Sequence, residues 1–403
     1  MAVHLGGALK WFTIIALATW AGIWWQTDLT RWQAGTLPAA NGQAGAFLRP
    51  LCTVRADHAS EIALDASANH IGIIGPAGQI RILDATGHPL TDVSVPGADA
   101  FAFTPEGQRV VAYARANASH TEVVFMRLDG SVLWRHDPGT AILDVAVAQS
   151  GQRAACVTAD GYVYSYQLDE APSFRRWRSV GNPTGTYVTP DGALVLVATA
   201  DPPSVWAYTP AGVFLWKAPN SDPKGDAQIF ASPDGQFLAC ATMPKDARSG
   251  SYTSRFVVLS RSGRQQWGAK LRASHPRVAL STDGKWAAVT YTKSVSTSPE
   301  PTYERKVVLF RTSSAGSSVP DQLWQHGGPL YDPRLVCIAG DGSFVATHDG
   351  KRSIFFFGPT GQLLWRHKMA HPIVRTCASA DGLSILVHCA DGSLSLLRVT
   401  DAL

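Results

Sequence analysis

This sequence has few charged residues. Only 16% of its 403 residues are Asp, Glu, Lys or Arg, against about 25% in ordinary globular proteins. A disordered chain needs low hydrophobicity with high net charge, and a long coiled coil needs abundant Glu, Lys and Ala, so both classes are excluded. The 35 basic and 31 acidic residues leave a net charge of +4, which is too small and too dispersed to predict a nucleic-acid partner.

Catalytic motifs are absent as well. The sequence contains no GxSxG, HExxH or GxxxxGK[ST] motif, and no GxGxxG follows a predicted strand. These are the patterns that position a nucleophile, a zinc ion or a phosphate group. We therefore expect no enzymatic activity, no cofactor and no metal site.

The six cysteines include no CxxC pair, and we interpret them as packing residues inside strands. Two of them, Cys377 and Cys389, lie on adjacent predicted strands. Counting outward from the Asp381-Gly382 turn places Cys377 opposite about Leu386, three residues short of Cys389. A disulfide between them is therefore not expected.

What the sequence has in abundance is Gly, Pro and Trp, with 36, 25 and 13 residues. A turn dipeptide, usually Asp-Gly, recurs between short apolar runs roughly 40 to 60 residues apart, which is a sign of a repeat architecture. The turns are Ala68-Asn69, Glu106-Gly107, Ser150-Gly151, Asp191-Gly192, Asp234-Gly235, Asp283-Gly284, Asp341-Gly342 and Asp381-Gly382. We interpret the recurring aspartates as turn residues, because Asp-Gly suits tight hairpins.

Each repeat reads as four short strands, which match one blade of a propeller. The fourth strand carries a Gly-x-x-x-Trp signature in several units, and we predict that six tryptophans share one blade position. They are Trp134, Trp177, Trp216, Trp267, Trp324 and Trp365.

The stretch LDGSVLWRH followed by VAVAQSGQRAACVTADGYVYSY is similar to the quinoprotein-type (PQQ-like) repeat, a relative of the WD40 repeat. The resemblance covers roughly residues 60–403 and implies a β-propeller in which each Trp packs between neighbouring blades. It also raises the alternative of a quinone-dependent dehydrogenase, an enzyme with bound Ca²⁺, a catalytic Asp and often a vicinal disulfide. This sequence has no Cys-Cys pair and no convergent acidic set to match that chemistry.

The last repeat ends at Leu403 without a fourth strand, and an orphan strand at 51–55 precedes the first repeat. Pairing the two would close the ring and leave no sheet edge exposed. We therefore predict an all-β fold, an eight-bladed β-propeller over 51–403. A seven-bladed ring, with the degenerate first unit used otherwise, is the alternative.

The N-terminus carries a nearly continuous apolar run at 11–27, with Trp11 at one end and Trp20, Trp24 and Trp25 at the other, and residues 5–9 extend it to 5–27 if the Lys10 ammonium reaches the membrane interface. Its length and aromatic ends predict a single transmembrane helix, with a cleaved signal peptide or a buried helix as alternatives. Residues 28–50 read as a flexible tether. Lys10 and the terminal amine place the N-terminus inside and the propeller outside the cytoplasm, in the periplasm or extracellular space.

Length variation is concentrated in three predicted loops between second and third strands, at 114–122, 243–255 and 292–306, of which the last two fall in consecutive blades. These last two combine basic and aromatic residues that suit recognition of a protein or a saccharide, although they are also explained as tolerated insertions. The candidate contact residues are Lys245, Arg248, Tyr252, Lys293, Tyr303 and Arg305.

The sequence thus favours a non-catalytic, membrane-anchored propeller that binds or scaffolds proteins, as a free module or as a subunit of a larger membrane or envelope complex. Two alternatives stay open. One is an enzyme with a PQQ-like cofactor or a scattered site, and the other is a WD40-like adaptor that faces the cytoplasm.

Overall fold

The computed structural model describes residues 48–98, 100–104, 109–113, 122–148, 150–168, 173–218, 225–244, 254–271, 274–294, 303–312, 320–328 and 336–400. Every described strand belongs to one compact unit within Ala44–Leu403. No helix within these described ranges is long and apolar enough to cross a membrane. The predicted membrane segment at 5–27, and the predicted tether up to residue 47, lie outside them.

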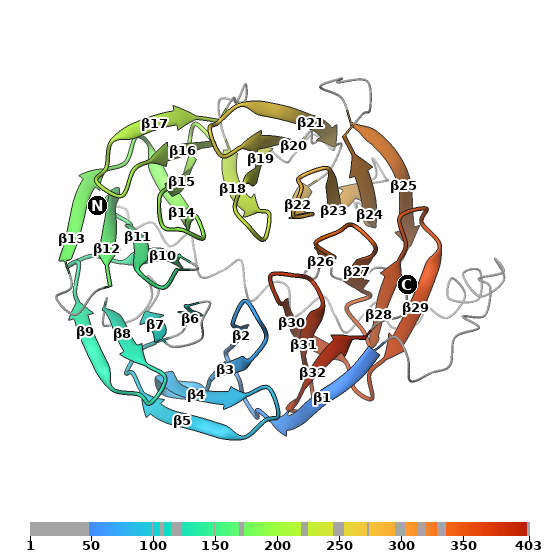
Figure 1. Cartoon of the computed structure of the whole chain (residues 1–403), viewed down its shortest axis with the longest axis horizontal. Helices are drawn as coiled ribbons and strands as arrows, with labels where there is room; N and C mark the ends of the chain where they lie inside the picture. Colours follow the sequence, from blue (N-terminus) through green and yellow to red (C-terminus); the bar gives the residue numbers. More distant parts are fainter. Residues whose placement is uncertain are drawn as a thin grey trace, which may run out of the picture. The chain divides into compact units, whose positions relative to one another are not determined.

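Thirty-two strands in the described part of the chain form eight four-stranded antiparallel sheets, which we number as blades 1 to 8 (Figure 1). Blade 1 contains β2 (Glu61–Leu64), β3 (His70–Ile74), β4 (Gln79–Asp84) and β5 (Pro89–Ser94), and blade 2 contains β6 (Ala100–Phe103), β7 (Arg109–Tyr113), β8 (Val123–Arg127) and β9 (Val132–His136). Blade 3 contains β10 (Ile142–Val147), β11 (Arg153–Thr158), β12 (Tyr162–Gln167) and β13 (Ser173–Arg178), and blade 4 contains β14 (Asn182–Val188), β15 (Val195–Ala200), β16 (Ser204–Tyr208) and β17 (Phe214–Lys217).

Blade 5 contains β18 (Gly225–Ala231), β19 (Phe237–Pro244), β20 (Ser254–Ser260) and β21 (Gln265–Leu271), and blade 6 contains β22 (Ser274–Leu280), β23 (Trp286–Ser294), β24 (Tyr303–Arg311) and β25 (Asp321–Gly328). Blade 7 contains β26 (Val336–Ile338), β27 (Val345–His348), β28 (Ser353–Phe357) and β29 (Leu363–Lys368), and blade 8 contains β30 (Ile373–Ala378), β31 (Ser384–Cys389), β32 (Ser393–Val399) and β1 (Leu48–Arg55). A single 3-10 turn, η1 (Pro76–Gly78), is the one helix within the described ranges.

Ring closure joins the two ends of the described chain. The first strands of successive blades contact one another from blade 1 to blade 7, and β2 of blade 1 also contacts β30 of blade 8. Strand β1 pairs antiparallel with β32, from Leu48 opposite Val399 to Arg55 opposite Ser393. It begins three residues before the predicted strand at 51–55. The degenerate first repeat forms a four-stranded sheet of its own, blade 1. The molecule is therefore an all-β propeller.

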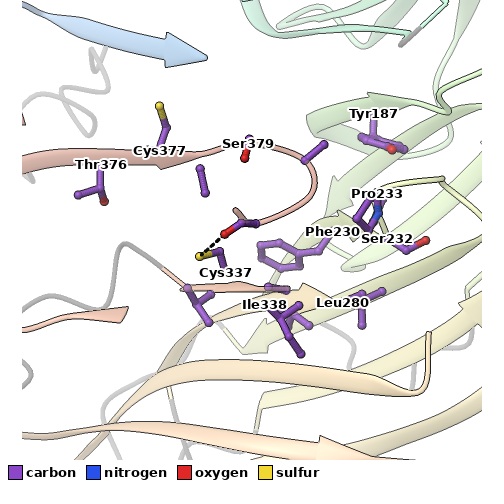
Figure 2. A pocket seen from close by; sticks show the side chains of 17 residues that line it. Tyr187, Phe230, Ser232, Pro233, Leu280, Cys337, Ile338, Thr376, Cys377 and Ser379 are labelled. Carbon is purple, nitrogen blue, oxygen red and sulfur yellow. Dashed lines mark hydrogen bonds between the residues drawn. The ribbon is translucent and has the colours of Figure 1, made fainter. Parts of the chain in front are cut away.

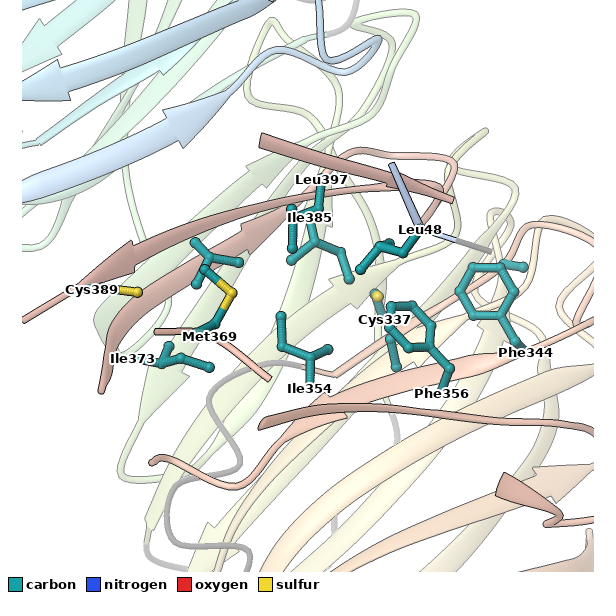
Figure 3. Close-up of a cluster of buried hydrophobic side chains, with 13 residues drawn as sticks. Leu48, Cys337, Phe344, Ile354, Phe356, Met369, Ile373, Ile385, Cys389 and Leu397 are labelled. Atoms are coloured by element: carbon teal, nitrogen blue, oxygen red, sulfur yellow. The ribbon is translucent and has the colours of Figure 1, made fainter. Parts of the chain in front are cut away.

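The hydrophobic core lies between the blades rather than at one centre. Both faces of the middle strands are covered by neighbouring sheets, so all six residues of β15 are buried, whereas the outer strand β17 is largely exposed. Figure 3 shows one such layer, where Ile354 and Phe356 of blade 7 meet Ile385 and Leu397 of blade 8. Because every apolar strand is shared between two layers, the middle strands read as continuous apolar runs.

Hydroxyl and carboxylate groups build the turns between first and second strands. In blade 6 the Ser281 hydroxyl donates to Asp283 Oδ1 at 2.7 Å, and the same oxygen accepts the Lys285 N–H at 3.0 Å. Gly284 has φ +64°, and a Cβ there would overlap the Phe237 ring of blade 5. The same Ser/Thr–Asp hydrogen bond recurs in blades 4, 5 and 8. The interpretation of these aspartates as turn residues is confirmed.

Because of these turn carboxylates, we expect the stability of the folded propeller to fall in acid. Partial burial raises the pKa of Asp283, but hydrogen bonds from Lys285 and Ser281 and the Lys285 charge outweigh it and hold the pKa below its usual value. A carboxyl whose pKa is lower in the folded state stabilises the fold above its unfolded pKa, near 3.9, and loses that contribution as the pH falls through the folded value.

We expect Asp283→Asn to cost about 1 kcal/mol or less at pH 6, because solvent screens this exposed side chain. The difference from wild type should shrink below pH ~4. Urea unfolding at pH 6 and pH 3 measures both, with the exposed Asp321→Asn as control. A deficit that is equal at the two pH values would contradict the prediction.

Candidate functional site

The candidate site is a cavity of about 420 Å³ at the inner strands of blades 4 to 8 (Figure 2). Its walls come from the carboxyl ends of β14, β18, β22 and β30 and from β26, together with the turns that follow β18 and β30. Phe230, Leu280 and Ile338 supply apolar surface from three different blades. Inner strands converge in this way because each blade contributes its first strand to the centre of the ring.

None of the 17 residues that line the cavity is charged. The Ser232 and Ser379 hydroxyls both donate to turn aspartates of their own blades, so they are already engaged. Thr376 Oγ1 is buried and has no hydrogen-bond partner among the described residues. The cavity therefore combines an apolar wall with one unsatisfied hydroxyl, a chemistry suited to binding.

The ionisable groups at the cavity are held neutral. Burial raises the pKa of Cys337 to about 12, and burial raises that of Cys377 to about 12 as well. Burial, with the charges of Asp234 and Asp191 adding to it, raises the pKa of Tyr187 to about 12. A thiol acts as a nucleophile only as the thiolate, so neither cysteine is activated at neutral pH. Figure 2 shows the Cys337 thiol directed instead to the carbonyl of Gly382, at 4.0 Å.

The cysteine predictions agree with the structure. Cys377 pairs with Leu386 in the β30–β31 ladder, as counted from the turn. All six cysteines are free, and five of them are buried.

The cavity and the strand ends that flank the predicted contact loops lie at opposite ends of the blades. The first strands of blades 4 to 8 end at the cavity, and the antiparallel second strands run away from it. The ends of β19 and β23, where the predicted loops begin, are consequently at the far end. The cavity was not predicted from the sequence, because its residues are ordinary strand residues such as Val, Ala and Ser. The one available signal was that first strands must face the ring centre.

The structure places the six candidate contact residues in two groups. Lys245, Arg248 and Tyr252 lie outside the described residues. Lys293 lies on β23, and Tyr303 and Arg305 on β24.

The prediction that the whole of 292–306 is a loop is therefore wrong. Residues 292–294 and 303–306 belong to a nine-residue strand pair, with Ser294 opposite Tyr303. Extending the ladder satisfies more backbone N–H and C=O groups than an early loop would. The predicted loop 243–255 is shortened in the same way, because β19 extends to Pro244 and β20 begins at Ser254.

The predicted tryptophans all lie on fourth strands, and five of the six hold one register position. Each of the five pairs with a third-strand residue just before a register shift: Trp134 with Phe125, Trp216 with Ala207, Trp267 with Val258, Trp324 with Leu309 and Trp365 with Phe356. Trp177 is different, because it pairs with Val163 in a ladder without such a shift.

These tryptophans pack against the following blade. The Trp216 ring lies against Gly263 and its Nε1–H donates to the carbonyl of Arg261 at 3.1 Å. Trp324 repeats this contact with Gly361 of blade 7. The two ends of the Gly-x-x-x-Trp signature thus serve successive interfaces, since the glycine of one blade receives the tryptophan of the preceding blade. The packing role that the resemblance implied is confirmed at these positions.

No family model and no curated protein matches this sequence. Solved structures match it in shape. The C-terminal WD40 domain of Sif2 is 10% identical with a TM-score of 0.64, covering 88% of this chain and 99% of that one. BamB from Moraxella catarrhalis is 15% identical with a TM-score of 0.59, covering 88% and 98%. Hydrazine synthase from Kuenenia stuttgartiensis is 14% identical with a TM-score of 0.52, covering 86% and 97%. At these identities the likeness shows the fold alone, which is that of a β-propeller.

Proposed function

We propose that this chain is a non-catalytic binding module whose central cavity receives an apolar side chain of a partner protein. The observation that carries the proposal is the uncharged lining of the cavity, built from inner strands of five blades. Anchor residues in protein interfaces typically fill such desolvated pockets. Propeller neighbours of the WD40 type are consistent with protein binding.

Membrane attachment through 5–27 and an extracytoplasmic propeller complete the proposal. They rest on the apolar run at 11–27 and on the basic residue Lys10 directly before that run. A reporter fused after Leu403 tests the orientation: activity of an extracytoplasmic reporter supports it. Activity of a cytoplasmic reporter would establish the adaptor alternative.

The enzyme alternative has one neighbour in its favour, hydrazine synthase. It predicts a visible cofactor spectrum or stoichiometric metal in the purified protein. The neutral thiols and uncharged lining of the cavity favour binding over catalysis, because acid–base chemistry needs a group whose pKa lies near the working pH.

The cavity proposal is tested by filling the space. Ala279 lines the cavity from β22, and Ala279→Phe should reduce partner recovery from detergent-solubilised membranes at least tenfold, about 1.4 kcal/mol or more of binding energy. Ala378→Phe fills it from blade 8. The matched control is Ala193→Phe, because Ala193 is exposed in a turn at the same end of the blades and does not line the cavity.

All three variants should melt within a few degrees of wild type. Partner recovery that is equal for Ala279→Phe, Ala378→Phe and Ala193→Phe would overturn the cavity as the contact site.

The two candidate loops remain a proposed second contact surface for a protein or a saccharide, with Lys245, Arg248, Tyr252, Lys293, Tyr303 and Arg305 as contact residues. Because strands extend into both predicted loops, the first is tested by replacing 245–253 with Gly/Ser, and the second by the exchanges Lys293→Ala, Tyr303→Ala and Arg305→Ala on β23 and β24. A variant that keeps the same partners at the same yield would exclude the residues it alters.

A further inference from the structure

A second cavity, of about 320 Å³, lies between blade 3 and blade 4, away from the central one. Blade 3 contributes Arg153, Ser165, Gln167, Ser173, Phe174 and Arg175, and the β16–β17 turn of blade 4 contributes Thr209, Pro210 and Ala211. This lining contains two guanidinium groups and no carboxylate.

The cavity occurs where blade 3 departs from the tryptophan pattern. In blade 4, Leu196 pairs with Ala207 and Ala207 with Trp216. The matching row of blade 3 runs from Ala155 through Ser165 to Arg175. Ala155 and Leu196 each lie four residues after their turn glycine, so the two rows are equivalent. Arg175 therefore holds the position that tryptophan holds in five other blades.

Two buried polar atoms at this interface have no partner among the described residues. Ser165 is 3% exposed, lines the cavity, and its Oγ makes no hydrogen bond there. Trp177, two residues beyond Arg175, still contacts Gly212 of blade 4, but its Nε1–H is also unsatisfied. Burying a hydroxyl or an indole N–H without a partner costs free energy. Blade 3 thus has polar groups without hydrogen-bond partners at an interface where five other blades have a tryptophan. This exchange lowers the stability of the fold.

The positive charge of the cavity is directed toward blade 4. Arg153 packs over Gly192 of blade 4 and pairs in the ladder with Gln167, so it lies on the same face of blade 3 as Ser165 and Arg175. Neither guanidinium forms an ion pair with another residue in the described ranges. Two guanidiniums and a hydroxyl donor are the groups that bind an oxyanion such as a carboxylate.

Exposed apolar side chains adjoin the cavity. Val213 and Phe214, directly after the β16–β17 turn, are 60% and 51% exposed. The Phe174 side chain does not contribute to this rim, because it lies on the opposite face of β13 from Arg175, against Trp134 and His136 of blade 2. An occupant that satisfies both the charge and this apolar rim is a peptide in which an acidic residue is flanked by apolar ones.

We propose that the cavity between blades 3 and 4 binds the carboxylate of an acidic side chain in a partner peptide. Arg153 and Arg175 pair with the carboxylate, the Ser165 hydroxyl donates to it, and the apolar rim contacts the flanking residues. This site is separate from the central cavity and does not depend on it.

The test measures binding of a fluorescein-labelled, terminally blocked peptide, Ser-Phe-Glu-Glu-Leu-Ser, to the full chain by anisotropy. The same peptide with Gln in place of both Glu is the matched ligand. We expect the Glu peptide to bind at least tenfold more tightly at an ionic strength of about 50 mM, with the difference declining as salt screens the charges.

Arg175→Gln and Arg153→Gln should each weaken the Glu peptide about tenfold. Ser165→Ala should weaken it severalfold while leaving the melting temperature equal or higher, since it removes an unsatisfied hydroxyl. The control is Arg178→Gln, which removes the same charge from the same strand on its opposite face. The central-cavity variant Ala279→Phe should leave peptide binding unchanged, so failure of either proposal is distinguishable from failure of the other.

Equal affinity for the Glu and Gln peptides, or equal losses in Arg178→Gln and Arg175→Gln, would overturn the proposal. Saturation of the site by citrate or inorganic phosphate with no measurable binding of the Glu peptide would also overturn the peptide as its occupant.

Discussion

Replacing Trp267 with alanine is expected to destabilise the propeller by about 3–5 kcal/mol, the usual cost of removing a buried aromatic side chain. The Trp267 side chain is fully buried in the layer between blades 5 and 6. Its ring contacts the Phe256 ring edge-to-face, with the ring centroids 5.6 Å apart, and its Nε1–H donates to the carbonyl of Gly284 at 3.4 Å. Alanine would leave a cavity between two sheets that neither sheet can close alone, because each is held by its other neighbour.

Urea unfolding followed by circular dichroism measures this cost. The matched control is Phe214→Ala, because Phe214 is an aromatic residue on a fourth strand that is about half exposed. Its removal should change the free energy of unfolding by about 0.5 kcal/mol or less. Equal unfolding midpoints for Trp267→Ala and Phe214→Ala would show that the interblade tryptophans do not hold the ring together.

Removing strand β1 is expected to abolish cooperative folding. β1 pairs with β32 along its length, and it buries Leu48 and Cys52 in two different interblade layers. Fully burying such side chains contributes roughly 1.5–3 kcal/mol each, against a typical total stability of 5–15 kcal/mol. Without β1, the backbone of β32 would form an unpaired edge, and an exposed apolar edge promotes aggregation.

The comparison is between a chain that starts at Ala44 and one that starts at Asp57. The longer chain should elute as a single species and melt in one transition, whereas the shorter chain should aggregate or melt without cooperativity. The buried His388 side chain also differs between the two chains. Its Nε2 forms a hydrogen bond with the Ala56 carbonyl, and only the longer chain contains Ala56. A shorter chain with the same melting temperature would show that the ring closes without this strand.

Much of the fold was predictable from the sequence, because its signals are local. An Asp-Gly turn needs only its own hydroxyl, carboxylate and glycine, so its position also determines the register on either side, as Cys377 opposite Leu386 shows. Four of the fourth-strand tryptophans were predictable for the same reason, since Trp134, Trp216, Trp267 and Trp365 each stand four residues after a turn glycine.

The sites were less predictable, because they depend on contacts between blades. Nothing local distinguishes Ala279 or Thr376 from any other strand residue, yet both line the central cavity. Residues at 292–306 looked like a loop because they are polar and rich in Ser, Thr and Pro, whereas strand pairing extends into this segment from both sides.

By itself, the sequence determined an all-β repeat fold, the turns and most of the tryptophan positions, since hairpin chemistry and strand periodicity act over a few residues. Only the tertiary structure decided which faces meet. It placed Arg175 at the tryptophan position of blade 3 and brought it beside Ser165 and Pro210. The reason is physical: a cavity between two sheets is set by the register of one blade against the next, and that register is not encoded within either blade alone.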